Sequence, residues 1–351
     1  MMALVGLASV STVTLAGCGG GEEGGTRQAE QLSQPERVAQ AQRGTVSITG
    51  TGTAVDAEKK KVASEAGGSG VIIDAGRGLI LTNNHVISGL TSARATVGGS
   101  ESTLQVVGRA PCQDLAVLRM TAPPSGIKQL KLGDSDKLKP GEHVTALGFP
   151  GSIEDEDFSD RSFSATEGSV STVKTTVAPS DDYPRLPNVI RHQAPISSGN
   201  SGGPLLNDAG EVVGINTGSD ETEGSQSQNV AVASTQAKSL LEDLKAGKDR
   251  SYLGWGLVVE EVKGEKSLYV SSVDAGSPAD DLRRATGGRD RVRFVPSDMI
   301  TEVDGTPVKD VADVCDILES KTPGDTLTVK GFELDEKNKY QEYDVRAKLE
   351  G

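Results

Sequence analysis

The sequence predicts a mainly β protein with two folded parts: an antiparallel barrel or sandwich, then a small α/β domain. The chain has 351 residues, which suits about two domains. Short β-branched or apolar runs recur between glycine-rich turns, and 43 glycines beside only 3% aromatic residues favour turn-rich β structure. The runs before residue 234 are not separated by amphipathic helices, so we expect antiparallel pairing there.

The composition excludes several classes of protein. With 36 Lys and Arg against 50 Asp and Glu, the formal net charge is −14, which argues against a nucleic-acid partner. Hydrophobic residues at 35% and charged residues at 25% exclude a wholly disordered chain and a polytopic membrane protein. Three Cys and three His exclude a disulfide-dense scaffold and a His-rich metal protein. We expect no metal ion and no cofactor.

The N-terminal stretch 1–17 has no charged side chain and predicts a secretory signal peptide. Its end, Leu15-Ala16-Gly17-Cys18, resembles the bacterial lipobox, in which the cysteine is acylated and becomes the mature N-terminus. The alternative is an ordinary signal peptide with an incidental cysteine. Residues 18–44 are polar and rich in Gly, Gln and Glu, as in a flexible linker. We therefore expect an exported protein of the bacterial cell envelope, lipid-anchored at Cys18.

Residues 45–247 form the first predicted folded part. A helix closes it, with Ser234 as the cap, an apolar stripe from Ala237 to Leu244, and Gly247 after its end. The expected strands contain Val46–Ile48, Val71–Ile73, Leu79–Thr82, Leu104–Val107, Leu115–Met120, Val144–Leu147, Val170–Val173, Val212–Ile215 and Val230–Ala233.

Residues 251–351 form the second predicted part. Two short helices are expected, one capped by Ser277 and followed by Pro278, the other capped by Asp310 with an apolar face from Val311 to Leu318. Cys112 and Cys315 fall one in each part, and we expect buried free thiols there rather than a disulfide. The expected strands lie near Leu257–Val262, Ser267–Val273, Met299–Val303, Thr326–Phe332 and Tyr340–Ala347.

The strongest local signal is the stretch Ser198–Pro204, in which three glycines surround Ser201. Glycine permits backbone conformations that aim the Ser201 hydroxyl outward while the amides of Gly199 and Ser201 converge on one point. A serine nucleophile needs such donors for the oxyanion that it creates, and also a neighbouring base. The alternative is an ordinary Gly/Ser loop. Because apolar runs flank the stretch on both sides, we expect an ordered turn between strands.

The base must be one of the three histidines. His85 follows the apolar strand Leu79–Thr82, so a rigid element positions it. His143 follows a turn, and His192 is expected to be an ordinary strand side chain. Asp114 stands directly before the apolar run Leu115–Met120, so its carboxylate can be partly buried and orient an imidazole. We therefore predict a triad of His85, Asp114 and Ser201.

Chain order separates the known triad folds. The motif around Ser201 formally fits the nucleophile elbow of α/β-hydrolases, but those enzymes place their histidine after the serine, and none follows His192. A subtilisin order could use Asp74, His85 and Ser201, but that fold needs helices that this part lacks. The order His85, Asp114, Ser201 on β structure is that of chymotrypsin.

The motifs together resemble those of the bacterial HtrA/Deg serine proteases. The resemblance implies a chymotrypsin-like fold of two six-stranded β-barrels, then a PDZ domain. It also implies ATP-independent cleavage of misfolded or exported proteins by a homotrimer or larger assembly. It rests on Gly68–Ile73, Thr82–Val86, Asp114–Leu118, Leu132–Ser135 and Gly199–Leu205.

The resemblance is incomplete around the substrate pocket. His192-Gln193-Ala194 and Ser197-Ser198 stand where the family has Thr-Asp-Ala and Asn-Pro. In this fold Ile196, Ile215 and Asn216 are expected to line the pocket. The stretch 193–198 has no acidic residue, so we expect a small aliphatic residue before the scissile bond rather than Lys or Arg. The acidic segment Ile153–Asp160 is expected to be a solvated loop.

The second part resembles the PDZ domain of the same family. Tyr252-Leu253-Gly254-Trp255 is similar to its carboxylate-binding loop, which implies binding of peptide C-termini. The connection Leu282–Pro296 is longer and more basic than usual, and we expect a surface loop there. The alternative function is that of a catalytically silent, chaperone-like peptide-binding protein of the envelope. The sequence leaves open the natural substrate, the activating signal and the oligomer size.

Overall fold

The computed structural model describes residues 33–55, 61–151, 162–220, 228–262, 264–274, 277–284, 291–292, 298–334 and 339–349. The predicted signal peptide, Cys18 and the acidic segment 153–160 lie outside these residues, as does most of the connection 282–296. Within the described ranges, no helix is both long and apolar enough to cross a membrane.

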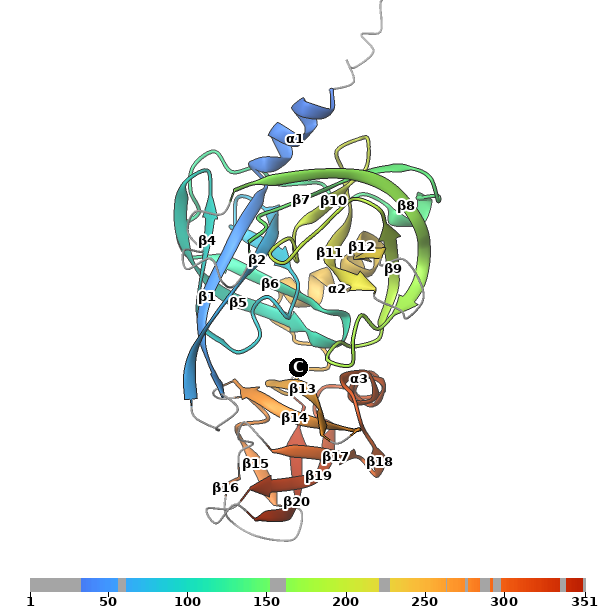
Figure 1. The fold of residues 1–351 in the computed structure, drawn as a ribbon. Helices are drawn as coiled ribbons and strands as arrows, with labels where there is room; N and C mark the ends of the chain where they lie inside the picture. Colours follow the sequence, from blue (N-terminus) through green and yellow to red (C-terminus); the bar gives the residue numbers. More distant parts are fainter. Residues whose placement is uncertain are drawn as a thin grey trace, which may run out of the picture. The chain divides into compact units, whose positions relative to one another are not determined.

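Six of the described strands close into a first barrel, in the order β1-β2-β3-β6-β5-β4 (Figure 1). Side chains alternate between its two faces, and Ile48, Ile72, Ile80 and Leu118 fill its interior. The sequence did not reveal β4, because this strand is rich in Thr, Ser and Arg and half exposed. The strands are β1 (Thr45–Val55), β2 (Lys61–Asp74), β3 (Leu79–Thr82), β4 (Leu90–Val97), β5 (Ser100–Ala110) and β6 (Leu115–Met120).

A second set of six described strands closes into another barrel, in the order β10-β11-β12-β9-β8-β7. Val144, Ile190 and Leu205 lie in its interior. A separate apolar cluster contains side chains from both barrels, among them Leu81 and Leu147, and joins the two. The strands are β7 (His143–Gly148), β8 (Ser164–Val177), β9 (Leu186–His192), β10 (Pro204–Leu206), β11 (Val212–Asp220) and β12 (Gln228–Ala233).

Two α-helices accompany the barrels, α1 (Gln34–Gln42) and α2 (Ser234–Lys245), with the 3₁₀ turns η1 (Pro111–Gln113) and η2 (Ser135–Lys137). Helix α1 lies inside the stretch predicted to be linker. Helix α2 confirms the expected apolar stripe, and Gly247 follows its end with a φ of 79°. The predicted cap is wrong, since Ala233 holds the N-cap position and the Ser234 hydroxyl donates to the Gly133 carbonyl at 2.8 Å.

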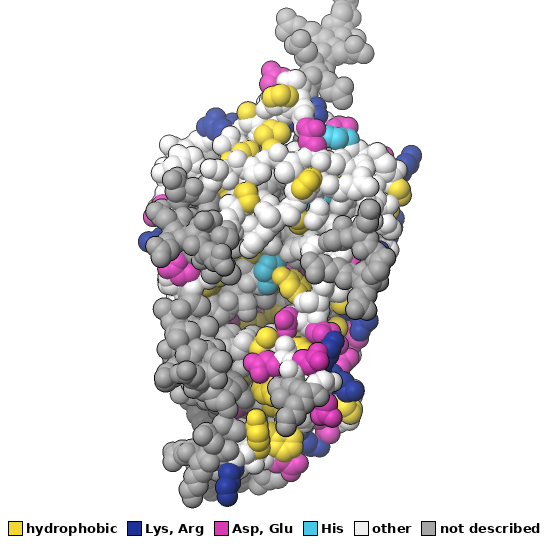
Figure 2. Space-filling view, in the orientation of Figure 1, with side chains coloured by type: hydrophobic (Ala, Val, Ile, Leu, Met, Phe, Trp, Pro, Cys, Tyr) yellow, Lys and Arg dark blue, Asp and Glu magenta, His cyan; other side chains and the backbone are white. Residues whose placement is uncertain are grey.

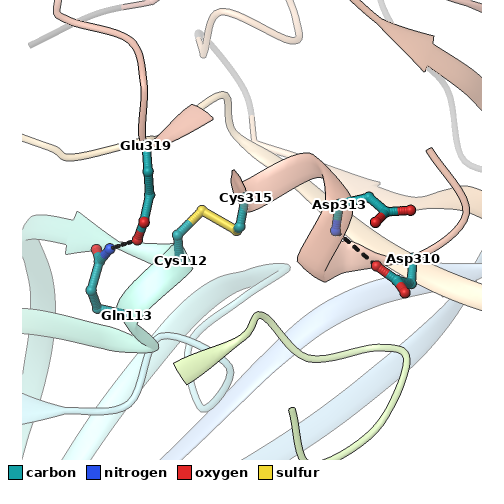
Figure 3. The surroundings of a disulfide bond; sticks show 6 residues. All are labelled: Cys112, Gln113, Asp310, Asp313, Cys315 and Glu319. Carbon is teal, nitrogen blue, oxygen red and sulfur yellow. Dashed lines mark hydrogen bonds between the residues drawn. A yellow bond between two sulfur atoms is a disulfide. The ribbon is translucent and has the colours of Figure 1, made fainter. Parts of the chain in front are cut away.

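The C-terminal part is one sheet, in the order β13-β14-β17-β19-β20-β15-β16, with β18 paired to β17. Its helix α3 (Val311–Leu318) begins as predicted, because the Asp310 carboxylate accepts from the Asp313 amide at 2.8 Å (Figure 3). The strands are β13 (Trp255–Val262), β14 (Glu265–Val273), β15 (Leu282–Arg284), β16 (Arg291–Val292), β17 (Met299–Val303), β18 (Thr306–Pro307), β19 (Thr326–Leu334) and β20 (Tyr340–Lys348).

The helix predicted at Ser277 is absent from the described residues, and a turn stands in its place. The Asp280 amide donates to the Ser277 carbonyl at 3.0 Å, and strand β15 begins two residues later. The Ala279 amide donates to the Leu253 carbonyl at 2.8 Å. This bond ties the turn to a neighbouring loop, so the local preference for a helix is overridden by tertiary contacts.

Cys112 and Cys315 form a disulfide, so the expectation of free thiols is wrong (Figure 3). The two residues are 203 positions apart in the chain, yet their Cα atoms lie 5.4 Å apart, since η1 of the first barrel domain contacts α3 of the C-terminal sheet. Sequence separation carries no information about such a contact, and the fold alone brings the two sulfurs together.

Candidate active site

The three predicted triad residues come from loops that follow regular elements. His85 follows β3, Asp114 ends η1 in a left-handed conformation with a φ of 51°, and Ser201 lies between β9 and β10. The Nδ1 atom of His85 lies 2.8 Å from Oδ2 of Asp114, and the His85 amide donates to Oδ1 at 2.9 Å. The Asp114 side chain is 3% exposed, so this carboxylate orients the imidazole from a nearly dry position.

Thr217 adds a further donor to the same carboxylate. Its hydroxyl donates to Asp114 Oδ2 at 2.6 Å, and the Asn83 side chain donates to the Asp114 carbonyl at 2.9 Å. Buried carboxylates are stabilised by such charge-assisted hydrogen bonds. Sequence reasoning missed Thr217, because a threonine in an apolar strand carries no signal of its own.

Ser201 shares a cavity with His85 but directs its hydroxyl elsewhere. The Ser201 hydroxyl donates to the Thr217 carbonyl at 3.0 Å, and within the described part of the chain its hydrogen bonds do not include one to His85. Both side chains, with Gly199, line a cavity of about 490 Å³. The fold therefore gathers the three predicted residues around one site, with the serine hydroxyl turned toward β11.

The loop around Ser201 holds two amides that have no acceptor among the described residues. The amides of Asn200, Gly202 and Gly203 donate to carbonyls at 2.8–3.0 Å. Those of Gly199 and Ser201 have no such bond among the residues that the structure describes. Two amides without a protein acceptor beside a candidate nucleophile can donate hydrogen bonds to an oxyanion and so stabilise it.

Ser69 of strand β2 fixes the orientation of this loop. Its amide donates to the Ser201 carbonyl at 2.7 Å, and its hydroxyl donates to the Gly199 carbonyl at 2.7 Å. The Ser198 carbonyl accepts from the Gly151 amide at 3.0 Å. With the carbonyls on either side of Gly199 engaged in this way, the loop has little freedom to rotate its peptide planes.

Only one of the three residues predicted to line the substrate pocket does so in the structure. Ile196 lines the cavity, whereas Ile215 and Asn216 do not, since Ile215 is packed in the core and the Asn216 side chain donates to the Pro204 carbonyl at 3.2 Å. The lining from β11 comes instead from the stretch 217–219. Among the described residues that line the cavity there is no Asp or Glu.

Tyr183, which the sequence analysis did not single out, packs against His85. The two ring centroids lie 5.3 Å apart with an interplanar angle of 61°, an edge-to-face contact. Burial raises the pKa of the Tyr183 hydroxyl well above its ordinary value. The residue lies in the connection between β8 and β9, so this connection forms one wall of the site.

The other two histidines lie away from the cavity. His192 is fully buried on β9, as expected of a strand side chain, and burial lowers its pKa to about 4. His143 is about one-third exposed, and its Nδ1 atom lies 2.8 Å from Oδ1 of Asp208. Neither lines the cavity that holds Ser201.

A second cavity of about 280 Å³ lies between β13 and α3, and Tyr252, Leu253 and Trp255 of the predicted carboxylate loop line it. Gly254 does not, but its φ of 79° and a distance of 2.0 Å from an added Cβ to the Ser277 Cβ require glycine there. Figure 2 shows Asp and Glu side chains interspersed with Lys and Arg side chains on the surface around α3.

Comparisons with known proteins agree on one family. Residues 68–215 match the model of the Trypsin-like peptidase domain. The chain is 32% identical over 304 residues to the "Serine protease Do-like HtrA" of Lactobacillus helveticus, covering 83% of this chain and 70% of that protein. It is also 32% identical over 285 residues to the protein of the same name from Bacillus subtilis (strain 168), covering 75% of this chain and 60% of the relative.

Among solved structures, "HtrA-type protease AlgW with tripeptide" matches with a TM-score of 0.52 and 25% identity, covering 91% of this chain and 97% of that one. This match supports the arrangement of two barrels and a C-terminal sheet. The chain spans about 60% of the length of the Bacillus subtilis relative.

Proposed function

The chain belongs to the Do-like HtrA family of serine proteases, and on this premise we propose that it is an ATP-independent serine endopeptidase of the cell envelope. Its substrates are misfolded or exported polypeptides. The observation that carries the proposal is the hydrogen bond of 2.8 Å between His85 Nδ1 and Asp114 Oδ2, because the same His85 lines the cavity that Ser201 also lines.

In the proposed reaction the Ser201 hydroxyl turns from the Thr217 carbonyl toward His85 Nε2. Its oxygen attacks the scissile carbonyl while His85 takes the proton, and Asp114 stabilises the imidazolium. The unengaged amides of Gly199 and Ser201 hold the oxyanion of the tetrahedral intermediate. His85 then donates the proton to the leaving amine, and a water molecule hydrolyses the acyl-enzyme by the same steps.

For the residue before the scissile bond we propose a small aliphatic side chain. The cavity presents Ile196 and the small residues of 217–219, and no carboxylate among its described lining residues complements Lys or Arg. A peptide library digested by the protein should yield cleavage after residues such as Val and Ala. A profile dominated by Arg or Lys would contradict this assignment.

For the C-terminal part we propose a PDZ domain that binds peptide C-termini. A peptide would add as a strand along β13, with its carboxylate held by the amides of the loop Tyr252–Trp255. The support is the cavity between β13 and α3 that this loop lines. The similar AlgW structure contains a tripeptide, which agrees with a peptide ligand.

The location that we propose is the cell envelope, with a signal peptide at 1–17 and a lipid anchor on Cys18. The disulfide between Cys112 and Cys315 supports an oxidising compartment, because cytosolic thiols are kept reduced. We also propose a homotrimer or larger assembly, which sedimentation of the purified protein tests directly.

Labelling by a fluorophosphonate probe tests the catalytic assignment. The wild type should be labelled and the Ser201→Ala variant should not, since the probe needs an activated serine. Ser198→Ala is the matched control, because Ser198 lines the same cavity and should leave labelling unchanged. Equal labelling of wild type and Ser201→Ala would refute the role of Ser201, and absence of labelling in the wild type would favour a catalytically silent peptide-binding protein.

A further inference from the structure

The disulfide lies next to the candidate triad and joins it to the candidate peptide site. Cys112 is in η1, two residues before Asp114, and Cys315 is in α3 (Figure 3). Beside the disulfide, the Gln113 side chain donates to the Glu319 carboxylate. Helix α3 is therefore bonded covalently to the segment that carries the triad carboxylate.

The same helix also contacts the connection that packs on His85. The Val311 amide, at the start of α3, donates to the Asp181 carbonyl at 3.1 Å. Farther along the helix, Asp316 lies 3.7 Å from Nε of Arg185. Tyr183, between these two anchor points, makes the edge-to-face contact with His85. We call residues 181–185 the clasp.

The clasp covers the strand along which a peptide would add. Strand β13 is an edge of the C-terminal sheet, so its outward amides are available to an incoming strand. The outward amide of Val259 instead donates to the Asp182 carboxylate. Asp181 forms an ion pair of 2.6 Å with Lys266 of the neighbouring strand β14. A peptide on β13 would have to displace Asp182.

Both sulfur-bearing residues border the cavity between β13 and α3, together with Asp182 and Tyr183 of the clasp. Cys112 is 1% exposed and Cys315 is 7% exposed, so this cavity is the approach to the disulfide. Helix α3 thus forms one wall of the proposed peptide site. Its disulfide holds it to η1, in the same two-barrel domain that contains the clasp. While the disulfide is intact, α3 and the clasp cannot separate freely.

We propose that the Cys112–Cys315 disulfide is a redox lock that keeps the peptide site of the C-terminal domain closed. This inference rests on the peptide-binding role proposed above. The polar contacts between α3 and the clasp, among the described residues, are the Val311–Asp181 hydrogen bond and the exposed Arg185–Asp316 ion pair, and an exposed ion pair is weak. Reduction then lets the C-terminal domain move away from the clasp, so that the Val259 amide becomes available to a peptide.

The chemistry of opening is thiol–disulfide exchange with a dithiol reductant. A thiolate of the reductant attacks one sulfur of the Cys112–Cys315 bond, that bond breaks, and a mixed disulfide forms. The second thiol of the reductant then displaces the protein thiolate. Two electrons and two protons pass to Cys112 and Cys315, and the reductant becomes a disulfide.

The test measures binding of a fluorescent peptide with a free, apolar C-terminal residue by anisotropy. The protein is the full chain carrying Ser201→Ala, which prevents cleavage, and Cys18→Ser, which leaves the two paired cysteines as the only thiols. Affinity is compared before and after treatment with dithiothreitol, with the thiols counted by alkylation and mass spectrometry. We expect at least about tenfold tighter binding after reduction.

The peptide affinity of two variants distinguishes opening of the peptide site from a general loss of structure. Cys315→Ser should bind as tightly as the reduced protein whether or not dithiothreitol is present. Asp182→Ala should tighten binding to the oxidised protein, because it exposes the Val259 amide, whereas Asp208→Ala, which removes a carboxylate paired with His143 elsewhere, should not. A peptide with an amidated C-terminus is the control ligand.

The outcomes distinguish this inference from the function on which it rests. Equal affinity of oxidised and reduced protein would overturn the lock and leave peptide binding intact. Failure of every form to bind would overturn both the lock and the assignment of the PDZ domain, while fluorophosphonate labelling would still report on the catalytic triad.

Discussion

The hydroxyl of Ser201 donates to the backbone carbonyl of Thr217 at 3.0 Å. The side chain of Thr217, in turn, donates to Asp114 at 2.6 Å, so one residue of β11 contacts two members of the candidate triad. The hydroxyl proton of Ser201 therefore points to a backbone carbonyl, which is not a base, and not to His85. In the proposed mechanism the Ser201 side chain rotates toward His85 when substrate binds.

Replacing Thr217 with Val should reduce kcat/KM by about tenfold to a hundredfold, since a hydrogen bond to a charged group contributes about 1.5–3 kcal/mol. The variant keeps the side-chain volume but removes the donor to Asp114. Thr217→Ser, which keeps the hydroxyl, is the control and should remain close to wild type. Steady-state cleavage of an unfolded protein checks this, and full activity in Thr217→Val would show that Asp114 does not need the bond.

Replacing Asp114 with Asn should lower kcat by about 10⁴-fold, the loss that this change causes in the chymotrypsin triad. The amide is nearly the same size as the carboxylate, so the fold is expected to survive. It cannot stabilise an imidazolium and favours the wrong tautomer of His85. Fluorophosphonate labelling rates and thermal unfolding should be measured on the same preparation. Near-normal labelling by a folded Asp114→Asn protein would remove Asp114 from the triad.

Replacing Gly202 with Ala should destabilise the protein by at least about 2 kcal/mol, because a side chain at positive φ costs about 1–2 kcal/mol before any clash. The residue has a φ of 85°, and an added Cβ would lie 2.1 Å from the Ser69 carbonyl oxygen. Gly218→Ala is the matched control, since Gly218 lines the active-site cavity and has open space around its Cβ position. Chemical denaturation compares the two, and equal stability would contradict the conformational requirement at Gly202.

The buried His192 should make folding sensitive to acid. Its pKa is lowered to about 4 in the folded protein, whereas an unfolded chain has the ordinary value of about 6.5. Between these values the unfolded state binds more protons, so stability falls as the pH drops from about 6.5 to about 4 and then levels off. The contribution of this residue is up to about 3 kcal/mol.

The free energy of unfolding, measured across this pH range, should fall less steeply in His192→Gln than in the wild type. His143→Gln is the control, since His143 is partly exposed and paired with Asp208, and it should keep the steeper dependence. If the slopes of wild type and His192→Gln coincide, His192 is not a source of the acid sensitivity.

The strands were predictable where apolar residues recur within a run, as in Leu79–Thr82 and Leu115–Met120, which lie in β3 and β6. Strand β4 was not predicted, because the polar residues on its exposed positions hide the apolar pattern of a strand. The prediction of a helix at Ser277 was wrong although the local sequence favoured one. Its local signal was clear, but the bond from Ala279 to Leu253 holds the segment as a turn. Local preference decides only where tertiary contacts do not compete with it.

The candidate triad was predictable because histidine is scarce and chain order excludes other triad folds. The residues that contact the candidate triad could not be predicted from the sequence. Tyr183 contacts His85, and Thr217 contacts Asp114, through pairings that join distant parts of the chain. Within the cavity, Ile196 is part of the lining, but Ile215 packs in the core and the lining from β11 begins at Thr217. The pairing of β11 with β12 shifts register between Asn216 and Gly218, and a bulge of this kind re-aims side chains in a way that the sequence pattern does not reveal.

The sequence by itself determined the class of fold and the choice of the candidate reacting groups, because strand periodicity, glycine placement and residue chemistry are local properties of the chain. Only the tertiary structure decided that Cys112 bonds to Cys315, that Asp182 covers the Val259 amide, and that the Ser201 hydroxyl faces Thr217. Each of these depends on a distance between segments remote in sequence, and such distances exist only once both barrels and the C-terminal sheet have packed.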